Sequence, residues 1–474
     1  MRTDALHHFV VLGAGPAGLG LATRILQRQD LKARVTVLEK KEMVGGLAAS
    51  FEYEGLTFDY GSHRLHPATD PDIMADVQAL LGKELLDRPR HGRIRLHGRF
   101  VHFPLKPFDL LTKLPPSFVA GFMTDAATKP LRRRNRQATF ADVLYQGLGR
   151  TMCDSFYFPY ARKLWGKEPE ALDAVQAHRR VAANNVLKIA AKVLAKLPGL
   201  RKPGTGRFFY PQRGFGQIST ALADAVRRRG GAIELGCHID GIRRTDEGGF
   251  RIDRAWAEPI FVHTRFSTIP ITTLVRLLQP APPESVLAAG NNLTFRAMVL
   301  HYLVLQTDQF TPFDAHYFPE ESILFSRMSE PKNYSNSTEP RGRTGLCFEI
   351  PCQMGDEIWN LDDTRLTERV LADLRKSGLA VNAPVVAGFA KRLPFIYPVY
   401  DLNFSRHLNQ LNDYVAGISG LITLGRQGLF VHDNTHHGLA MAYKACDCIN
   451  PDGTWDQAFW QTQLQIFAEQ VVED

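Results

Sequence analysis

The apolar and polar positions near the start of the chain predict a strand, a tight turn and a helix. An apolar run, FVVL, spans residues 9–12, and three glycines follow within the next six positions. Residues 16–27, PAGLGLATRILQ, then place apolar side chains at helical spacing. A second apolar run, ARVTVL at residues 33–38, predicts a further strand. The segment is therefore typical of a βαβ unit.

The rest of the chain alternates between strand-rich and helical patterns. A strand running into a loop is predicted over 56–66, a hairpin ending at prolines over 92–107, and mainly helix over 108–200. Further strands are predicted within 230–244, 266–278, 294–305 and 345–352, and residues 420–449 fit a strand, a loop and a helix. The sequence contains no internal repeat and no low-complexity linker.

This order predicts an α/β fold with a discontinuous nucleotide-binding domain. Residues 1–70, 205–275 and 411–474 are expected to form that domain. Residues 71–204, including a helical lid, and residues 276–410, including a sheet, are expected to form a second, mixed α+β domain. Ligands settle preferentially at sheet switch points and domain interfaces, so the site is expected between the two.

The three glycines after the first strand have separate tasks in this pattern. Gly13 permits a sharp turn, Gly15 lets the backbone approach a pyrophosphate, and Gly18 lets the helix pack closely on the strand. The pyrophosphate would lie at the positive end of the helix dipole. Glu39 ends the second strand about 20 residues later, where a carboxylate accepts hydrogen bonds from ribose hydroxyls. The pattern therefore predicts a dinucleotide site.

Composition narrows the range of partners. The 474 residues are 44% hydrophobic and 22% charged, which is typical of a folded protein with a large core. The formal charge of +8 is a weak indication of an anionic partner, and because the basic residues are dispersed, nucleic acid is not expected. Six cysteines without a C-x-x-C pair fit a reducing cytoplasm. The absence of a secretory leader and of an apolar run of about 20 residues predicts a cytoplasmic protein, at most peripheral to the inner face of the membrane.

A second glycine pair, Gly45-Gly46, follows Glu39 and decides which dinucleotide is expected. Its stretch, EKKEMVGGLAAS, resembles the FAD-binding signature of the flavoenzyme superfamily of amine oxidases, protoporphyrinogen oxidases and UDP-galactopyranose mutases. The resemblance implies FAD as cofactor and a Rossmann-type, glutathione-reductase-like FAD domain beside a discontinuous mixed α+β substrate domain. The cofactor contacts that it implies come from Gly13, Gly15, Pro16, Ala17, Gly18, Glu39, Lys40, Gly46, Leu47, Gly61, Ser62, His63, Ile239, Gly425, Arg426, Asn434 and Thr435.

Six further stretches, in the same order, resemble the UDP-galactopyranose mutase branch of this superfamily. They are YGSHRLH (60–66), YARKLWG (160–166), LTFRAM (293–298), FSRMSEPKNY (325–334), IYPVYD (396–401) and GRQG (425–428). The match implies catalytic roles for His63 beside the flavin ring and for Arg327 near anionic groups of the substrate. The substrate contacts that it implies come from Tyr160, Trp165, Arg327, Tyr397, Phe430 and His432.

The residues alone leave these roles open. Without the resemblance, His63 is more typical of a hydrogen-bonded loop histidine, and Arg327 is equally typical of a surface ion pair. Tyr160 and Trp165 are as typical of a core as of a cleft.

The chain departs from the mutase pattern at three positions. Phe430 and His432 stand where mutases carry two tyrosines that bind a diphosphate, and phenylalanine cannot donate a hydrogen bond. Asn434 stands where mutases carry an acidic residue near the ribityl chain. The leading hypothesis is therefore an FAD-dependent oxidoreductase that takes a hydride from a C–N or C–C bond of a small-molecule substrate. The alternatives are a redox-neutral mutase-like enzyme acting on a nucleotide- or lipid-linked sugar, and a flavin-binding protein without turnover.

The histidines near the C-terminus raise the hypothesis of a metal site. His432, His436 and His437 have ligand-like spacing. The same stretch starts the final predicted helix, where Asp433 and Asn434 are good N-cap residues. No metal is therefore expected.

Residues 184–204 have the pattern of a basic amphipathic helix. Lys188, Lys192 and Lys196 are spaced four apart, and the apolar stripe is formed by Val186, Ile189, Val193 and Leu197. Such a helix can lie on an anionic membrane surface and admit an anionic or lipid-linked substrate. The alternative is an ordinary core-packed helix with solvated lysines.

Overall fold

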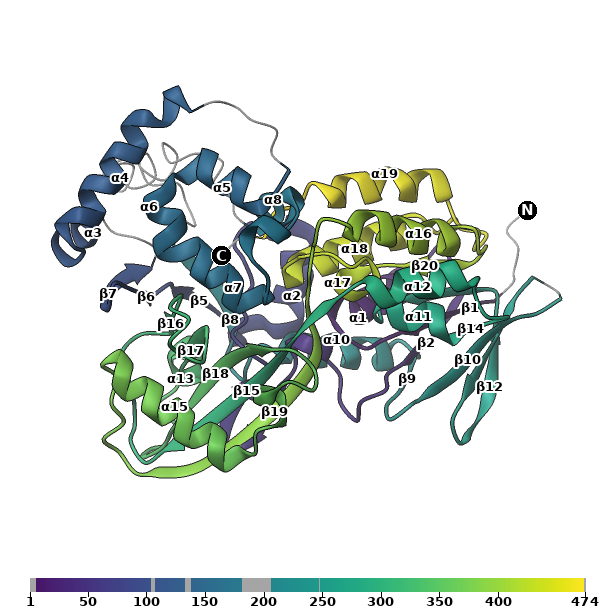
Figure 1. The fold of residues 1–474 in the computed structure, drawn as a ribbon. Coiled ribbons are helices and arrows are strands. Elements are labelled where there is room, and N and C mark those ends of the chain that lie inside the picture. Colours follow the sequence, from purple (N-terminus) through teal and green to yellow (C-terminus); the bar gives the residue numbers. More distant parts are fainter. Residues whose placement is uncertain (1–5, 104–106, 133–137, 181–205, 247, 473–474) are drawn as a thin grey trace.

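The computed structural model describes residues 6–103, 107–132, 138–180, 206–246 and 248–472. Figure 1 shows a parallel sheet with its helices in one part of the molecule, and a large antiparallel sheet with a layer of helices in the other. The predicted amphipathic segment 184–204 lies outside the described residues.

β1 (His7–Leu12) lies at the centre of a five-stranded parallel sheet. The sheet order is β20 (Leu421–Thr423), β13 (Thr264–Ser267), β1, β2 (Ala33–Leu38) and β9 (Ala232–Glu234). Successive side chains of β1 enter different hydrophobic clusters, Phe9 and Val11 on one face, Val10 and Leu12 on the other. A strand that is buried on both faces explains the unbroken apolar run in the sequence.

Both faces of the parallel sheet are covered. On one face pack α1 (Pro16–Gln27), α10 (Gln217–Arg228) and α18 (Thr435–Asp447). On the other lies a four-stranded sheet of β12 (Ala257–Val262), β11 (Phe250–Arg254), β10 (Ile239–Arg244) and β14 (Leu278–Gln279), in that order. Helices α11 (Ile271–Leu277), α12 (Glu284–Asn292) and α16 (Phe404–Ala416) join the same hydrophobic cluster.

The second sheet has seven strands and is mostly antiparallel. Its order is β19 (Val385–Pro398), β15 (Phe295–Leu305), β18 (Thr344–Cys352), β17 (Arg327–Ser329), β16 (Ala315–Tyr317), β6 (Gly92–Leu96) and β7 (Arg99–Phe103). One hydrophobic cluster joins this sheet to α15 (Asp363–Ser377). Another cluster joins it to the hairpin of β3 (Ser50–Tyr53) and β4 (Leu56–Asp59), whose chain then runs toward His63.

A helical layer packs against the β6, β7 and β16 end of that sheet, through a cluster that includes Phe118, Leu164 and Tyr317. It contains α3 (Pro107–Lys113), α4 (Pro116–Thr128), α5 (Phe140–Leu148), α6 (Arg150–Met152), α7 (Phe158–Trp165) and α8 (Ala174–Arg180). The remaining elements are α2 (Pro71–Leu81), α13 (Pro331–Ser335), α14 (Glu357–Asn360), α17 (Gly425–Gly428), α19 (Gln457–Ala468) and the paired strands β5 (Leu85–Pro89) and β8 (Arg207–Pro211). None of the described helices is long and apolar enough to cross a membrane.

The fold class predicted from the sequence is confirmed, since a Rossmann-type parallel sheet is combined with a mixed α+β part. The parallel sheet takes strands from the start, the middle and the end of the chain. The hairpin predicted over 92–107 is present as β6 and β7. The domain limits at residues 70, 204, 275 and 410 stay a prediction.

Candidate cofactor and active site

The turn between β1 and α1 constrains each of its three glycines differently. Gly13 has a φ of +102°, and a Cβ there would collide with the hydroxyl of Thr268. A Cβ on Gly18 would collide with the carbonyl oxygen of Gly13, which explains why the helix packs so close to the strand. Gly15 differs, because a Cβ there would meet no other atom within 4 Å. The space beside Gly15 is therefore open, at a helix N-terminus where anions bind.

Glu39 is held in the same turn. Its side chain is only 9% exposed, and its two carboxylate oxygens accept hydrogen bonds from the backbone N–H groups of Ala14 and Lys41 at 2.8 and 2.9 Å. The N–H of Gly45 donates to the carbonyl of Ala14 at 2.8 Å, which brings the second glycine pair against the first turn. A buried carboxylate therefore lies directly beside the open space at Gly15.

The C-terminal part of the chain reaches the same end of α1. A Cβ on Gly425, whose φ is +76°, would lie 3.0 Å from the Cβ of Ala17, so α17 abuts the first turn of α1. Arg426 donates to the backbone carbonyl of Asp433 at 3.2 Å, and Asn434 is the N-cap of α18. Residues predicted from three distant stretches are thus brought together.

Arg426 and Asp433 each retain a buried polar atom that has no hydrogen-bond partner among the described residues. These atoms are Nε of the arginine and Oδ2 of the aspartate. Burial raises the pKa of Asp433 to about 7 and lowers the pKa of Arg426. Buried polar atoms are normally paired, so this donor and acceptor fit polar groups of a nucleotide. The sequence indicated Asp433 only as an N-cap residue, because spacing cannot reveal burial.

The turn after β4 places His63 at the other end of the candidate site. Its Nε2 lies 3.0 Å from the carbonyl oxygen of Tyr60, which can only accept, so Nε2 carries the hydrogen and Nδ1 keeps a lone pair. The ring stacks on Phe215 with centroids 5.4 Å apart. Burial lowers the pKa of His63, so the imidazole is neutral at pH 7.

Arg327 is locked to a carboxylate that the sequence analysis missed. Its Nε and Nη2 donate to Oε1 and Oε2 of Glu349, both at 2.8 Å, and Glu349 is only 3% exposed. The backbone N–H of Ser62 donates to the same Oε1 at 2.8 Å. Burial opposes the charge of Arg327, but Glu349 outweighs it and raises the arginine pKa well above its ordinary value. Glu349 therefore joins the Gly61–His63 turn to Arg327.

A second arginine, Arg64, extends this network. It donates to the Tyr334 hydroxyl at 3.1 Å and lies 3.5 Å from a carboxylate oxygen of Asp314. Tyr334 also shares a hydrogen bond with the Ser62 hydroxyl. Burial opposes the charge of Arg64, but Tyr334 and Asp314 raise its pKa above the ordinary value. The sequence offered no signal for this role beyond the position of Arg64 next to His63.

Two of the predicted substrate residues lie close to Arg327. Tyr160 is near enough to interact electrostatically with Arg327 and Tyr397, and burial raises the pKa of its hydroxyl. The guanidinium groups of Arg180 and Arg426 each lie 5.1 Å from the ring centre of Tyr397. These side chains form an aromatic and cationic wall.

Three other predicted substrate residues lie inside the packed protein. Trp165 is 5% exposed and meets Phe140 edge-on at 5.3 Å. Phe430 has no exposed surface and packs against Phe295 at 4.7 Å. His432 is 1% exposed and shares hydrogen bonds with the side-chain amide of Gln176. Trp165 Nε1 and His432 Nδ1 are buried without a hydrogen-bond partner among the described residues, and the substrate roles of Trp165, Phe430 and His432 stay a prediction.

The other predicted cofactor residues lie at the starts of elements or in the segment after β2. Lys40 is exposed, whereas Leu47 is partly buried beside the β3–β4 hairpin. Pro16, Thr435 and Ile239 begin α1, α18 and β10, respectively, and Gly46, with a φ of +56°, would bring a Cβ within 3.4 Å of the Gly15 Cα.

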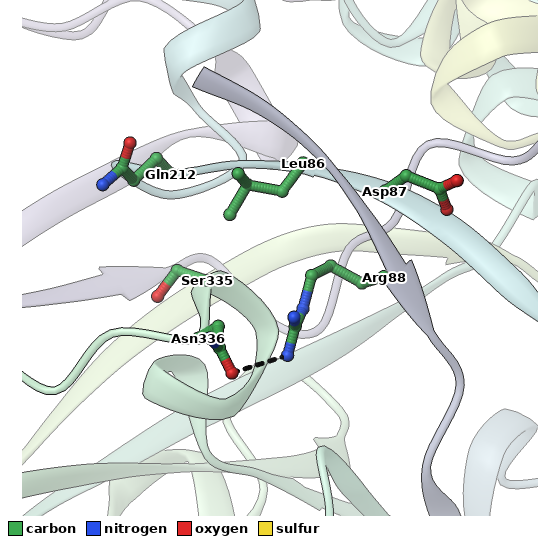
Figure 2. Close-up of a pocket in the computed structure, with 6 residues that line it drawn as sticks. All are labelled: Leu86, Asp87, Arg88, Gln212, Ser335 and Asn336. Atoms are coloured by element: carbon green, nitrogen blue, oxygen red, sulfur yellow. Dashed lines mark hydrogen bonds between the residues drawn. The ribbon is translucent and has the colours of Figure 1, made fainter. Parts of the chain in front are cut away.

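Figure 2 shows a separate, shallow pocket of about 290 Å³. It is lined by Leu86, Asp87, Arg88, Gln212, Ser335 and Asn336. Arg88 donates to the side-chain oxygen of Asn336 at 3.0 Å. The lining contains none of the predicted site residues, so this pocket is distinct from the candidate cofactor site.

Two of the three histidines that suggested a metal, His436 and His437, have rings 4.1 Å apart. A further histidine, His66, stacks on His436 at 5.8 Å. Within the described ranges, no group of three or more His, Cys, Asp or Glu side chains could hold a metal ion.

The glycine turn, the buried Glu39 and the parallel sheet together have the arrangement of a Rossmann-type α/β protein. Residues 16–389 match the model of the flavin containing amine oxidoreductase family. The chain belongs to this family, as the resemblance indicated.

The similar proteins carry the names of enzymes with different reactions. A chloroplastic protoporphyrinogen oxidase 1 from Spinacia oleracea is 20% identical over 91% of this chain and 81% of its own length. A chloroplastic prolycopene isomerase from Arabidopsis thaliana is 23% identical over 50% of this chain, but the match spans only 43% of that relative. The crystal structure of reduced UDP-galactopyranose mutase superposes with a TM-score of 0.81 at 19% identity, covering 98% of each chain. The fold is thus shared across enzymes with different names.

Proposed function

We propose that this chain is an FAD-dependent oxidoreductase that takes a hydride from a C–N or C–C bond of a small organic substrate. The observation that carries the proposal is the open space beside Gly15. It adjoins the N-terminus of α1, the buried carboxylate of Glu39 and the segment that carries Arg426 and Asp433. A bare backbone suits a pyrophosphate, and the carboxylate suits a ribose, so the residues fit FAD.

The family match implies a flavin cofactor, and the residues near the glycine turn would hold it. Gly15 and Glu39 would bind the pyrophosphate and the adenosine ribose, and Arg426, Asp433 and Asn434 would bind polar groups nearer the ring. When bound, FAD supplies a two-electron acceptor for the hydride.

The side chains near His63 suit a substrate that must lose a proton during oxidation, such as an amine. The neutral imidazole of His63 has its hydrogen on Nε2, so Nδ1 can accept a proton. Arg327 stays charged because Glu349 compensates it, and a charged guanidinium binds an anionic substrate group. Tyr160 and Tyr397 provide flat walls that orient the substrate and exclude water.

A redox-neutral sugar mutase is the second candidate, and Phe430 argues against it. Phe430 carries no hydroxyl and has no exposed surface, so it offers no donor to a nucleotide-sugar diphosphate. Nε2 of His432 is engaged by Gln176, whereas its Nδ1 has no hydrogen-bond partner among the described residues, so His432 does not decide between the two candidates. Because Arg327 stays charged, the proposed oxidoreductase could take a substrate with an anionic group.

The cofactor assignment is tested by Gly15→Ala, with Gly290→Ala as the matched control. Neither substitution creates a clash, because an added Cβ meets nothing within 4 Å at Gly15 and only ordinary contacts, the nearest 3.7 Å, at Gly290. We expect purified Gly15→Ala protein to lose flavin absorbance at least about tenfold, because the methyl group fills the space for the pyrophosphate. Full flavin occupancy in Gly15→Ala would contradict the assignment.

The reaction is tested by anaerobic titration of the flavin-loaded protein with amines, tetrapyrroles and nucleotide sugars. An oxidoreductase is bleached by its substrate alone and recovers its spectrum when an electron acceptor is added. Turnover that requires prior reduction and returns the flavin to the same oxidation state would support the mutase instead. Flavin that no compound bleaches or engages would support a binding protein without turnover.

A further inference from the structure

The helical layer carries large apolar side chains that are exposed to solvent. Phe108 is 73% exposed, Met123 60% and Leu131 83%. They lie on α3, on α4 and on the short helical turn Lys129–Leu131, which are consecutive in the chain and contact one another. Exposed apolar residues are ordinary when scattered, but three on adjoining elements indicate an interaction surface.

The exposed positions of α4 have an unusual composition for a surface helix. They are Pro116, Ser117, Ala120, Met123, Thr124, Ala127 and Thr128, and none of them is charged. The hydroxyls of Thr124 and Thr128 donate to carbonyls one turn back in the same helix, at 2.9 and 2.8 Å. Their hydrogens are therefore satisfied within the helix, and we call this surface, with Phe108 and Leu131, the α3–α4 face.

The sequence of this part of the chain is basic. Residues 107–136 contain six basic residues and two acidic ones, Asp109 and Asp125. Asp109 is 4% exposed, is bound by the backbone and ring of His102 and pairs with Lys113 at 3.1 Å, and Asp125 accepts from the backbone of Thr151 at 2.8 Å and pairs with Arg132. Each carboxylate is thus paired with one basic residue, and the remaining excess of positive charge belongs to the sequence stretch 129–136 that contains Leu131.

We propose that the α3–α4 face docks on the surface of a bilayer that contains anionic lipids. An apolar, uncharged centre beside basic residues matches acyl chains beside anionic headgroups. A second copy of this chain would bring two basic surroundings together, so it fits less well. Figure 1 places α3 and α4 at one end of the molecule, away from the hairpin of β11 and β12. The inference goes beyond the proposed redox function and does not depend on turnover.

The test is flotation of the full-length protein with vesicles of phosphatidylcholine, with and without phosphatidylglycerol. We expect binding to the anionic vesicles at low salt and weaker binding at high salt. The triple variant Phe108→Glu, Met123→Glu, Leu131→Glu should reduce the bound fraction by at least about tenfold, since each change adds charge at an apolar contact. An unchanged melting temperature checks that the variant is folded.

The chain offers a matched control at the far hairpin, where Trp256 is 95% exposed and Phe261 61%. Trp256→Glu, Phe261→Glu adds charge at equally exposed apolar positions and should leave vesicle binding within about twofold. The proposal is overturned if the anionic vesicles are not bound, or if only this control variant loses binding. It is also overturned if Lys188→Gln, Lys192→Gln, Lys196→Gln loses binding while the triple variant keeps it. A dimer in sedimentation that the triple variant dissociates would assign the face to a second copy instead.

Discussion

Replacing Glu349 with glutamine tests the network between Arg327 and the Gly61–His63 turn. The carboxylate accepts three hydrogen bonds at 2.8 Å, two from Arg327 and one from the N–H of Ser62. A glutamine keeps one acceptor oxygen but presents an NH₂ group to a guanidinium that can only donate. The substitution also leaves Arg327 charged and only 17% exposed without a counter-ion.

The expected cost follows from these changes. Losing one charge-assisted hydrogen bond costs about 1.5–3 kcal/mol, and breaking a buried ion pair from one side costs about 3–5 kcal/mol in total. Removing the arginine instead, by Arg327→Met, leaves the carboxylate buried and should cost a similar amount. The double variant removes both charges, so its loss should be smaller than the sum of the two single losses by about 2 kcal/mol or more.

The assay is urea unfolding of the three variants and the parent protein at pH 7, followed by tryptophan fluorescence. Glu349→Gln should lower the free energy of unfolding by about 3–5 kcal/mol. Simple additivity in the double variant, within about 0.5 kcal/mol, would refute the reasoning, because independent residues add. Glu339→Gln serves as the control, since its ion pair with Arg341 is exposed and should contribute little.

Two further predictions concern pH. Burial lowers the pKa of His436 to about 3 and of His437 to about 4, so at these two positions the unfolded chain binds protons that the folded protein does not. Their contribution to the unfolding free energy should therefore fall by roughly 2 kcal/mol per pH unit between pH 6 and 4, measured by urea unfolding as the difference between the parent protein and the variant His436→Gln, His437→Gln; a difference that does not change with pH would contradict the assignment. Burial raises the pKa of Asp433 to about 7, so the contribution of this one carboxyl group to stability falls as pH rises from about 4 to 7. Flavin-free Asp433→Asn protein should therefore be more stable than the parent at pH 8 by about 2–4 kcal/mol, and equal melting temperatures at pH 8 would argue against it.

Short-range signals predicted which residues lie together at the start of α1. The glycine turn, Glu39 and the Gly45-Gly46 pair act through the backbone within about 35 residues, so their spacing carries the geometry. Gly425 was placed by the resemblance, and the structure brings it to the same helix start.

The substrate end was harder to predict, because it depends on pairing between distant strands. Glu349 meets Arg327 only because β17 and β18 pair in a particular register, which no local pattern encodes. Aromatic residues such as Trp165 and Phe430 are typical both of a cleft wall and of a core, and the sequence alone does not predict their burial.

The interleaved strand order of the parallel sheet has a consequence for biosynthesis. β1, the middle strand of the sheet, is made at the start of translation, yet the edge strand β20, which pairs with β13, and the Gly425–Asn434 segment are made some 400 residues later. The edge of β13 lacks its partner until β20 has been made some 150 residues later, which is an opportunity for aggregation and for chaperones. The proposed cofactor site is therefore complete only once nearly the whole chain has been made, because its last segment ends at Asn434 of 474 residues.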